Sequence, residues 1–202
     1  MKERRAEKAD LRREEVAHAT WKLMGELGVE GTSLRAVAHA LETTTGMLTH
    51  YFRNREDMIT YTKGFMAKLV GARMRKAFSG DPKTRLWRSF RGLLSTSKDR
   101  RHNEKVWLAF IAAGLSSPKI SGQNEYELKN LRLQFEDFVK EGHQRNKRKS
   151  SLNPEDEADL LVCLSEGLSL AAIVNPKQFT SARLEHLGRI GFESITRQSI
   201  KN

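Results

Sequence analysis

The chain has 202 residues, of which 38% are hydrophobic, with 36 Lys and Arg against 25 Asp and Glu and a formal net charge of +11. This composition suits a helical core in one or two domains, and the single cysteine, Cys163, excludes an intrachain disulfide and fits a reducing compartment. Since no apolar run approaches the roughly 18 residues that span a bilayer and the charged N-terminus lacks the apolar core of a signal peptide, we expect a cytoplasmic protein without membrane contact.

The apolar spacing predicts helices along the whole chain, and no period-2 pattern of strand length occurs. Three prolines, at positions 82, 118 and 154, follow capping residues and suit the first position of a helix. We therefore expect an all-α fold of about nine helices, near residues 10–27, 33–40, 44–50, 55–77, 82–96, 102–115, 118–142, 154–174 and 180–198.

The stretch from Thr32 to Phe52 predicts a helix-turn-helix. Its first helix has an inner face at the i, i+3, i+4, i+7 spacing, formed by Leu34, Val37, Ala38 and Leu41. Thr32 or Ser33 can cap its start, and Thr43 and Thr44 then interrupt the pattern and can cap the next helix. A helix-turn-helix presents its second helix to the major groove of DNA. The alternative is a pair of short helices in an ordinary bundle.

The second helix of the motif carries small and largely uncharged outer side chains. An inward stripe is expected from Leu48, Tyr51 and Phe52, which leaves residues that can approach base edges without burying an unpaired charge. Arg53 and Arg55 flank a helix start that Asn54 and Asp57 can cap, so they suit phosphate oxygens. The full set expected at DNA is Thr32, Ser33, Thr43, Thr44, Thr45, Gly46, Met47, Thr49, His50, Tyr51, Arg53 and Arg55.

Residues 12–59 resemble the DNA-binding domain of TetR-family transcriptional repressors. The resemblance is carried by the runs Leu27-Gly28-Val29-Glu30-Gly31-Thr32-Ser33, Leu48-x-x-Tyr51-Phe52 and Asn54-Arg55-Glu56-Asp57-Met58. Three positions depart from the family pattern: Glu42 replaces a turn glycine, Thr49 replaces a phosphate-binding tyrosine, and Arg55 replaces the usual lysine. The resemblance implies a DNA-binding domain over residues 1–57 and a helical ligand-binding and dimerisation domain over residues 58–202.

The last two expected helices resemble the pair through which this family forms dimers. Small residues on an apolar stripe permit close helix crossing, and a two-fold axis would then bring two recognition helices to successive half-sites of a double-stranded operator. Part of the same faces must also serve the core of the monomer. The residues expected at the dimer interface are Leu160, Leu164, Gly167, Leu168, Ala171, Leu184, Leu187, Gly188 and Gly191.

Five aromatic residues fall on helices that surround the ligand cavity in this family. The segment Val106-Trp107-Leu108-Ala109-Phe110 is similar to the C-terminal domain of the choline-responsive branch, and aromatic rings can cage a cation. The alternative is that these rings are plain core. The expected ligand residues for a small-molecule inducer of unknown identity are Trp87, Phe90, Trp107, Phe110 and Phe135.

The positive charge is concentrated after the helix-turn-helix. Residues 58–109 carry 13 basic and 3 acidic side chains, whereas residues 1–57 carry 10 of each. The excess either holds the protein near DNA, binds an acidic ligand, or forms a solvated face. The charged N-terminal run MKERRAEKA is interpreted as a frayed arm that either touches DNA or stays disordered.

An enzyme is not expected, because the chain lacks a catalytic constellation. The six histidines are scattered without a metal-ligand spacing, Cys163 lies in an apolar helix, and no Gly-rich phosphate loop occurs. We expect no catalytic residue, metal or cofactor. The sequence thus predicts a TetR-like, ligand-responsive repressor that binds a palindromic operator as a dimer. The alternative is an inducer-independent DNA-binding architectural or adaptor protein.

Overall fold

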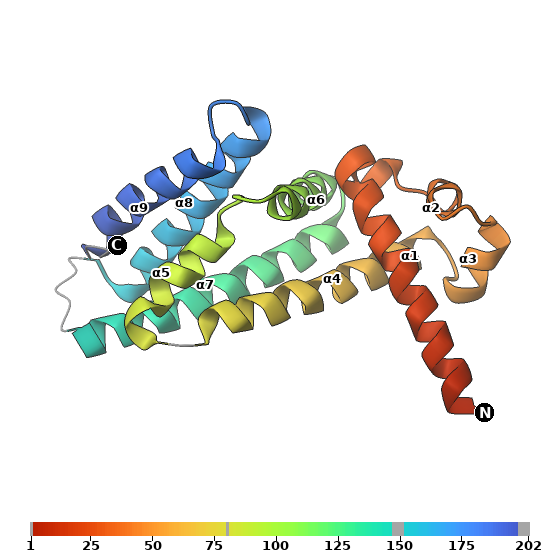
Figure 1. Ribbon diagram of the computed structural model, residues 1–202, viewed down its shortest axis with the longest axis horizontal. Coiled ribbons are helices and arrows are strands. Elements are labelled where there is room, and N and C mark those ends of the chain that lie inside the picture. Colours follow the sequence, from red (N-terminus) through yellow and green to blue (C-terminus); the bar gives the residue numbers. More distant parts are fainter. Residues whose placement is uncertain (1, 80, 147–151, 198–202) are drawn as a thin grey trace. The chain divides into compact units, whose positions relative to one another are not determined.

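The computed structural model describes residues 2–79, 81–146 and 152–197, and every regular element in these ranges is a helix (Figure 1). The helices are α1 (Lys2–Gly31), α2 (Leu34–Ala40), α3 (Thr45–Tyr51), α4 (Arg55–Phe78), α5 (Pro82–Leu93), α6 (Lys98–Gly114), α7 (Pro118–Asn146), α8 (Pro154–Val174) and α9 (Ser181–Thr196). The expected all-α fold is confirmed. No helix in the described ranges is both long and apolar enough to cross a membrane.

One compact unit consists of the residues up to Ala72 together with Lys105–Ala113. In it α1 packs against α2 and α3, and α2 packs against α3. The buried cluster that joins these helices to the start of α4 consists of Val16, Val37, Ala38, Leu48, Phe52 and Met58. The inner faces expected for the two short helices therefore form the core of this unit, since Leu34 and Leu41 also pack against the cluster.

The first helix is longer than expected, because it begins at Lys2 rather than near residue 10. Figure 1 shows its N-terminal half projecting past α3. Arg13 attaches α1 to α4, with its guanidinium carbon 4.4 Å from the centre of the Tyr61 ring. Near its C-terminal end α1 is kinked at Gly28, whose φ of 73° suits glycine.

The second compact unit consists of Arg73–Glu104 and the residues from Gly114 onward. In it α7 packs against α5 and α8, and α9 packs against α5 and α8. Its core cluster is Leu86, Phe90, Leu94, Phe135, Val139, Ala158, Leu161, Val162 and Phe192. As expected, a proline opens α8, and the side chain of its N-cap, Asn153, accepts a hydrogen bond from Asp156 N at 2.8 Å.

The first unit is larger than the DNA-binding domain expected from the sequence. The boundary expected between residues 57 and 58 falls in the first turn of α4, whereas the unit continues along α4 as far as Ala72. The DNA-binding domain therefore remains a prediction from the motif, set within this larger unit.

Candidate nucleic-acid interface

The turn between α2 and α3 keeps a left-handed residue although it has no glycine. Glu42 has a φ of 52°, and the amides of Glu42 and Thr43 donate to His39 O and Ala38 O at 3.1 and 2.9 Å. This pair of hydrogen bonds is the Schellman ending of a helix, in which the left-handed position is usually glycine. The turn geometry is thus set by the hydrogen bonds of α2, and Glu42 adopts it at a steric cost.

The helix α3 presents a polar face. Its N-cap is Thr44, whose side chain accepts from Met47 N at 3.2 Å, while Leu48 is fully buried. Among the residues expected to contact DNA, Met47 and Tyr51 are half-buried. The exposed ones on this helix are Thr45, Gly46, Thr49 and His50. These four form a small, uncharged surface of the kind that can enter a groove and offer hydrogen bonds to base edges.

Three residues expected at DNA have other local roles in this unit. Thr32 is 0% exposed and its hydroxyl donates to Gly28 O at 2.8 Å. Its side chain therefore has no surface to offer DNA, which corrects the expectation for this residue. Ser33 is the N-cap of α2, accepting from Ala36 N at 3.1 Å, and Thr43 is half-buried in the turn.

Arg53 lies exposed just before α4. Its side chain is 87% exposed, its Nε lies 3.6 Å from Asp57 Oδ2, and its backbone N donates to the same oxygen at 3.0 Å. That backbone hydrogen bond lowers the pKa of Asp57. The side chain of Asn54 accepts from Asp57 N at 2.9 Å, so the expected cap of α4 forms. The carboxylate of Asp57 accepts in turn from the backbone N of Arg53 and not from that of Asn54. A guanidinium held so loosely can reach a phosphate.

Arg55 is used within the unit itself. Its Nε donates to Thr32 O at 2.7 Å, and Nη2 donates to Val29 O. Nη2 also lies 3.9 Å from Glu30, a carboxylate that is 81% exposed. The side chain, which is 37% exposed, thus spans from the start of α4 to the junction of α1 and α2.

The sequence interpretation missed an arginine on α2. Arg35 is exposed, and it forms no hydrogen bond or ion pair in the part of the chain that the structure describes. It lies next to the inward Leu34, near the N-cap Ser33, on the helix that precedes α3. The signal for it was available, since an arginine off the apolar spacing of a helix-turn-helix lies on its outer face.

Two of the residues expected at a dimer interface are instead part of the core of the second unit. Leu184 is 0% exposed, and Gly188 is buried. A Cβ at Gly188 would come within 2.7 Å of Leu94 Cδ1 and 3.3 Å of Phe90 Cε1. These two positions are therefore filled by the chain's own side chains and are not available to a second copy, which corrects the expectation for them.

The other expected dimer residues divide into exposed and half-buried groups. Leu160 and Gly167 are exposed. The half-buried ones are Leu164, Leu168, Ala171, Leu187 and Gly191. Within this group Leu164 and Leu168 pack against the core cluster, and Gly191 allows Leu164 to lie close to α9.

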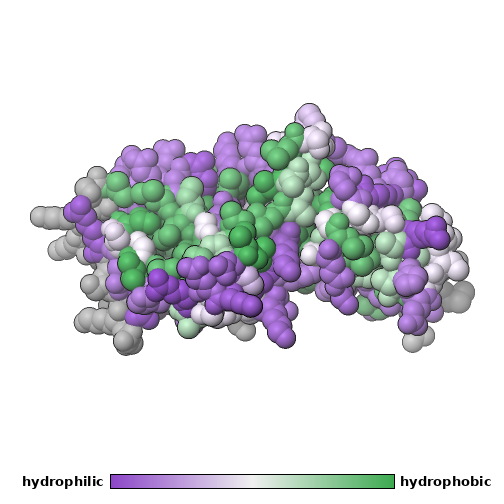
Figure 2. Space-filling view, turned by 90° about the horizontal axis from the view of Figure 1, so that it is seen from above, coloured by the Kyte–Doolittle hydropathy of each residue, from purple (hydrophilic) through white to green (hydrophobic). Residues whose placement is uncertain are grey.

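An exposed stripe of apolar and small residues runs along α8. Its members follow one another at alternating spacings of three and four residues and are Leu160, Cys163, Gly167, Leu170 and Val174. Leu170 is 44% and Val174 75% exposed, and Ile190 on the neighbouring α9 is 52% exposed. In Figure 2 apolar side chains gather over the part of the chain that contains α8 and α9. The 3–4 spacing is typical of a helix that packs against another helix.

The aromatic residues expected at a ligand belong to two different compact units. In the second unit Phe90 and Phe135 are 0% exposed members of the core cluster. Trp87 is half-buried, with its ring centre 5.1 Å from that of Phe192. These three rings have the surroundings of core residues, as the alternative interpretation holds.

The remaining two aromatic residues, Trp107 and Phe110, belong to the first unit. Trp107 is half-buried. Phe110 is 3% exposed, and the ammonium of Lys63 lies 4.8 Å from the centre of its ring. Phe110 thus already holds a cation of the chain itself, by an attraction to the face of the ring.

Several basic side chains of the segment 58–109 are paired within the chain. Arg85 lies 2.6 Å from Glu141 on α7, and Arg91 lies 2.7 Å from Glu185 on α9. These pairs join α5 to the other helices of its unit. Part of the positive excess therefore serves the structure and is not free to form a field for DNA.

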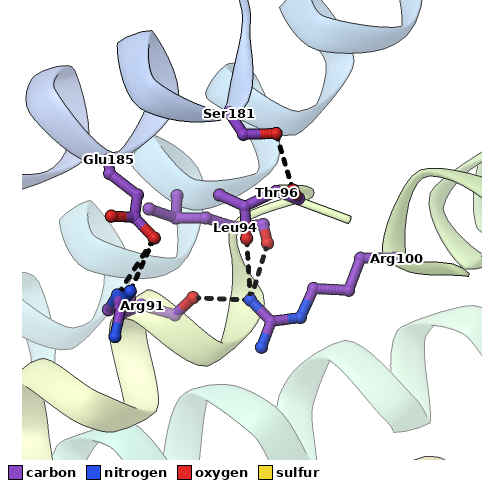
Figure 3. Close-up of polar contacts among 6 residues, drawn as sticks. All are labelled: Arg91, Leu94, Thr96, Arg100, Ser181 and Glu185. Carbon is purple, nitrogen blue, oxygen red and sulfur yellow. Dashed lines mark hydrogen bonds and ion pairs between the residues drawn. The ribbon is translucent and has the colours of Figure 1, made fainter. Parts of the chain in front are cut away.

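Figure 3 shows how a further arginine of this segment is used. Arg100 Nη1 donates to Arg91 O and Leu94 O, each at 3.2 Å, and to Thr96 Oγ1 at 3.1 Å. The backbone oxygen of Thr96 accepts from Ser181 Oγ at 2.6 Å. Carbonyls at a helix C-terminus carry partial negative charge, so the guanidinium stabilises the end of α5 and fixes the turn to α6.

Glu104 on α6 is a half-buried carboxyl group. It forms no hydrogen bond or ion pair within the described ranges. Burial, and secondarily the charge of Glu166 on α8, raises the pKa of Glu104 from 4.5 to about 7. A half-buried carboxylate without a hydrogen-bond or ion-pair partner among the described residues favours a proton or a cation beside it.

Comparisons with known proteins agree with the helix-turn-helix interpretation. Residues 17–62 match the family model of bacterial regulatory proteins of the tetR family, and residues 82–197 match that of the BetI-type transcriptional repressor, C-terminal. The regulator PksA of Bacillus subtilis is 24% identical over 92% of this chain and 90% of its own length. BetI of Proteus mirabilis is 26% identical over 88% of each chain.

Solved structures share the fold. A transcriptional regulator from Rhodococcus sp. Rha1 aligns over 92% of this chain and 96% of its own, with a TM-score of 0.78 and 25% identity. A regulator from Saccharomonospora viridis, solved in complex with choline, aligns over 96% of this chain and 100% of its own, with a TM-score of 0.82 and 17% identity.

Proposed function

This chain belongs to the TetR family and is a transcriptional regulator with a C-terminal domain of the BetI repressor type, and from that premise we propose that it represses transcription by binding a palindromic operator as a homodimer. The observation that carries the proposal is the exposed, uncharged face of α3, which offers Thr45, Gly46, Thr49 and His50 beside a capped helix start. Such a face can reach base edges in the major groove.

We assign the contacts as follows. Thr45, Thr49 and His50 read base edges, and the exposed guanidinium groups of Arg53 and Arg35 hold phosphates on either side. Arginine suits phosphate because its charge is permanent and its donors are arranged as a fork. Compared with the set expected from the sequence, this assignment leaves out Thr32, which is buried, and adds Arg35.

A second copy of the chain is the proposed partner of the α8 stripe. Leu160, Leu170 and Val174 present apolar surface at a spacing suited to helix packing, and Ile190 extends that surface onto α9. A two-fold interface is self-complementary, so one stripe serves both copies. Dimerisation matters for function because two recognition helices bind two half-sites, whereas one short helix alone binds weakly.

We propose that a small organic cation is the inducer. Support comes from Glu104 on α6, a half-buried carboxyl group whose pKa is raised by burial and, secondarily, by the charge of Glu166 on α8. A related regulator from Saccharomonospora viridis was solved with choline. A ligand that binds the DNA-free state more tightly would lower operator affinity. The alternative is an inducer-independent architectural or adaptor protein, which a cation would not release from DNA.

This proposed role needs no catalysis, and its relatives are regulators rather than enzymes. We infer that the chain is not an enzyme and that it works in the cytoplasm, where its operator is. Both statements follow from the proposed function.

Fluorescence anisotropy with a labelled operator tests the proposal. We expect tight binding to an operator selected from random DNA and weak binding to a scrambled duplex of the same composition. Choline, but not its neutral isostere 3,3-dimethyl-1-butanol, should release the operator. Equal affinity for both duplexes would contradict the regulator, and release by neither compound would favour the inducer-independent alternative.

A further inference from the structure

We propose that Arg55 is a positioning residue that fixes the junction of α1 and α2, and through α2 the recognition helix α3, to the start of α4, and that it is not a phosphate contact. The inference deepens the proposed function and rests on it for the DNA measurements. Asn54 caps α4, so Arg55 is the first residue of that helix. A cation is unfavourable there because a helix N-terminus carries partial positive charge.

The guanidinium instead reaches the end of another helix. α1 ends at Gly31, and the last carbonyls of a helix have no partner within it. Arg55 donates from Nη2 to Val29 O and from Nε to Thr32 O, the latter at 2.7 Å. Its charge therefore faces the negative end of α1, where a cation is stabilising.

The junction that receives these hydrogen bonds is largely shielded from water. Val29 is 3% and Thr32 0% exposed. The hydroxyl of Thr32 donates to Gly28 O, and the amide of Thr32 donates to Val29 O at 3.2 Å. Removal of Arg55 would leave Thr32 O without a hydrogen-bond donor in a shielded place, and an unsatisfied carbonyl favours local rearrangement.

What Arg55 holds is the start of the reading motif. Ser33, the N-cap of α2, follows Thr32 directly, and α2 packs against α3. The direction of α3 relative to α4 is thus set at one end by the buried cluster of Leu48, Phe52 and Met58, and at the other by the two hydrogen bonds of Arg55. Loss of these bonds should loosen the alignment of α3 without removing any group that touches DNA.

The chain offers a matched control two residues away. Arg53 has the same charge, is 87% exposed, and makes only a loose ion pair with Asp57 at 3.6 Å. Two full-length variants, Arg55→Ala and Arg53→Ala, are titrated by fluorescence anisotropy against the selected operator and an unrelated duplex, over a series of salt concentrations. A third, Arg55→Lys, retains the charge without the guanidinium fork.

The proposal predicts a distinct pattern for each variant. Arg55→Ala should lose at least tenfold in operator affinity, keep its affinity for the unrelated duplex, and keep the parent's salt slope. Arg53→Ala should lose affinity for both duplexes, and its slope of log affinity against log salt should become shallower by about 0.9, the value for one phosphate contact. Arg55→Lys should recover operator binding only in part.

Two results would overturn the inference. A shallower salt slope for Arg55→Ala, with full recovery in Arg55→Lys, would make Arg55 a phosphate contact. If the folded Arg55→Ala variant bound the operator as tightly as the parent, Arg55 would contribute only to the stability of the fold.

Amide hydrogen exchange of the DNA-free protein tests the same inference without relying on the proposed function. Exchange should accelerate in Arg55→Ala across residues 29–36 and stay at the parent's rate in Arg53→Ala. Unchanged exchange at residues 29–36 would contradict the positioning role of Arg55 even if DNA binding changed. Failure of the parent to select any operator would contradict the proposed function but would leave the exchange result standing.

Discussion

Gly188 of α9 lies directly against Leu94, the residue that follows α5, so that a Cβ built on Gly188 would come within 2.7 Å of Leu94 Cδ1. At Gly167 of α8 the same construction meets nothing within 4 Å. The two glycines stand in the same expected interface but have opposite surroundings. Gly188 is a packing requirement of the chain's own core, whereas Gly167 faces open space on the exposed stripe.

Alanine at these two positions should therefore have opposite effects on stability. Gly188→Ala forces Leu94 to move in a closed core and should lower the free energy of unfolding by about 1–3 kcal/mol. Gly167→Ala should raise it by up to about 1 kcal/mol, because alanine favours the helix. Urea unfolding at one fixed protein concentration measures both. Equal stability of Gly188→Ala and the parent would show that the close approach is not a constraint.

The turn of the helix-turn-helix should gain stability from glycine. Glu42 has a φ of 52°, and relief of that conformation in Glu42→Gly should raise the free energy of unfolding by about 1 kcal/mol. Glu42→Ala is the control, since it removes the carboxylate and keeps the Cβ. A gain of the same size in both variants would mean that charge, rather than backbone conformation, limits the turn.

Glu104 should make stability fall as the pH rises from about 4.5 to 7. Its pKa in the folded chain is raised to about 7, so across this window the folded state keeps a proton that the unfolded state releases. The contribution is present in full below pH 4.5 and is lost as the pH passes 7; its size is on the order of 3 kcal/mol.

Glu104→Gln should remove that dependence. Compared with the parent, the variant should gain stability at pH 8 and show little change at pH 4.5, in urea unfolding at each pH. The exposed Glu125→Gln on α7 is the control and should follow the parent at both values. If the free energy of unfolding of Glu104→Gln depended on pH as the parent's does, Glu104 would be excluded as the origin of the pH dependence.

The α8 stripe should be required for dimers. Leu170→Asp places a charge on the proposed interface and should shift the protein to monomers, with operator affinity reduced at least tenfold. Leu133→Asp on α7 is matched in exposure, at 49% against 44% for Leu170, and should leave the dimer intact. Size-exclusion chromatography with light scattering gives the mass. If the Leu170→Asp variant remained a dimer, the interface would have to lie outside the α8 stripe.

Base reading by α3 should be visible in sequence preference. Each of His50→Ala and Thr49→Ala should select an operator that differs from the parent's at one or two positions, because a lost base contact relaxes discrimination where it acted. Their affinity for unrelated DNA should change little. Selection of the parent's operator by both variants would remove these residues from the base contacts.

The short helices were predictable because their spacing alone defines an inner face. Val37, Ala38 and Leu48 are buried where the spacing put them, and Thr44 caps α3. The extent of α1 was not predicted correctly. The charged N-terminal run was interpreted as frayed, although Lys, Arg, Glu and Ala all favour helix.

The sequence could not predict the environment of residues that have two possible packing partners. The apolar stripes of α8 and α9 had to serve the monomer's core and the exposed face together, and only packing separates Gly188 from Gly167. Arg55 was expected on phosphate because of its charge near a helix start. Its partner Val29 lies 26 residues earlier in the chain and becomes adjacent only through the fold.

The central claim is that two copies of this chain read a symmetric DNA site through α3. Selection of bound duplexes from a random pool by the full-length protein tests it most directly. The account predicts enrichment of one palindromic sequence, with half-sites about one helical turn apart or a small multiple of it. Enrichment of a single, non-symmetric site, or of no sequence at all, would contradict it.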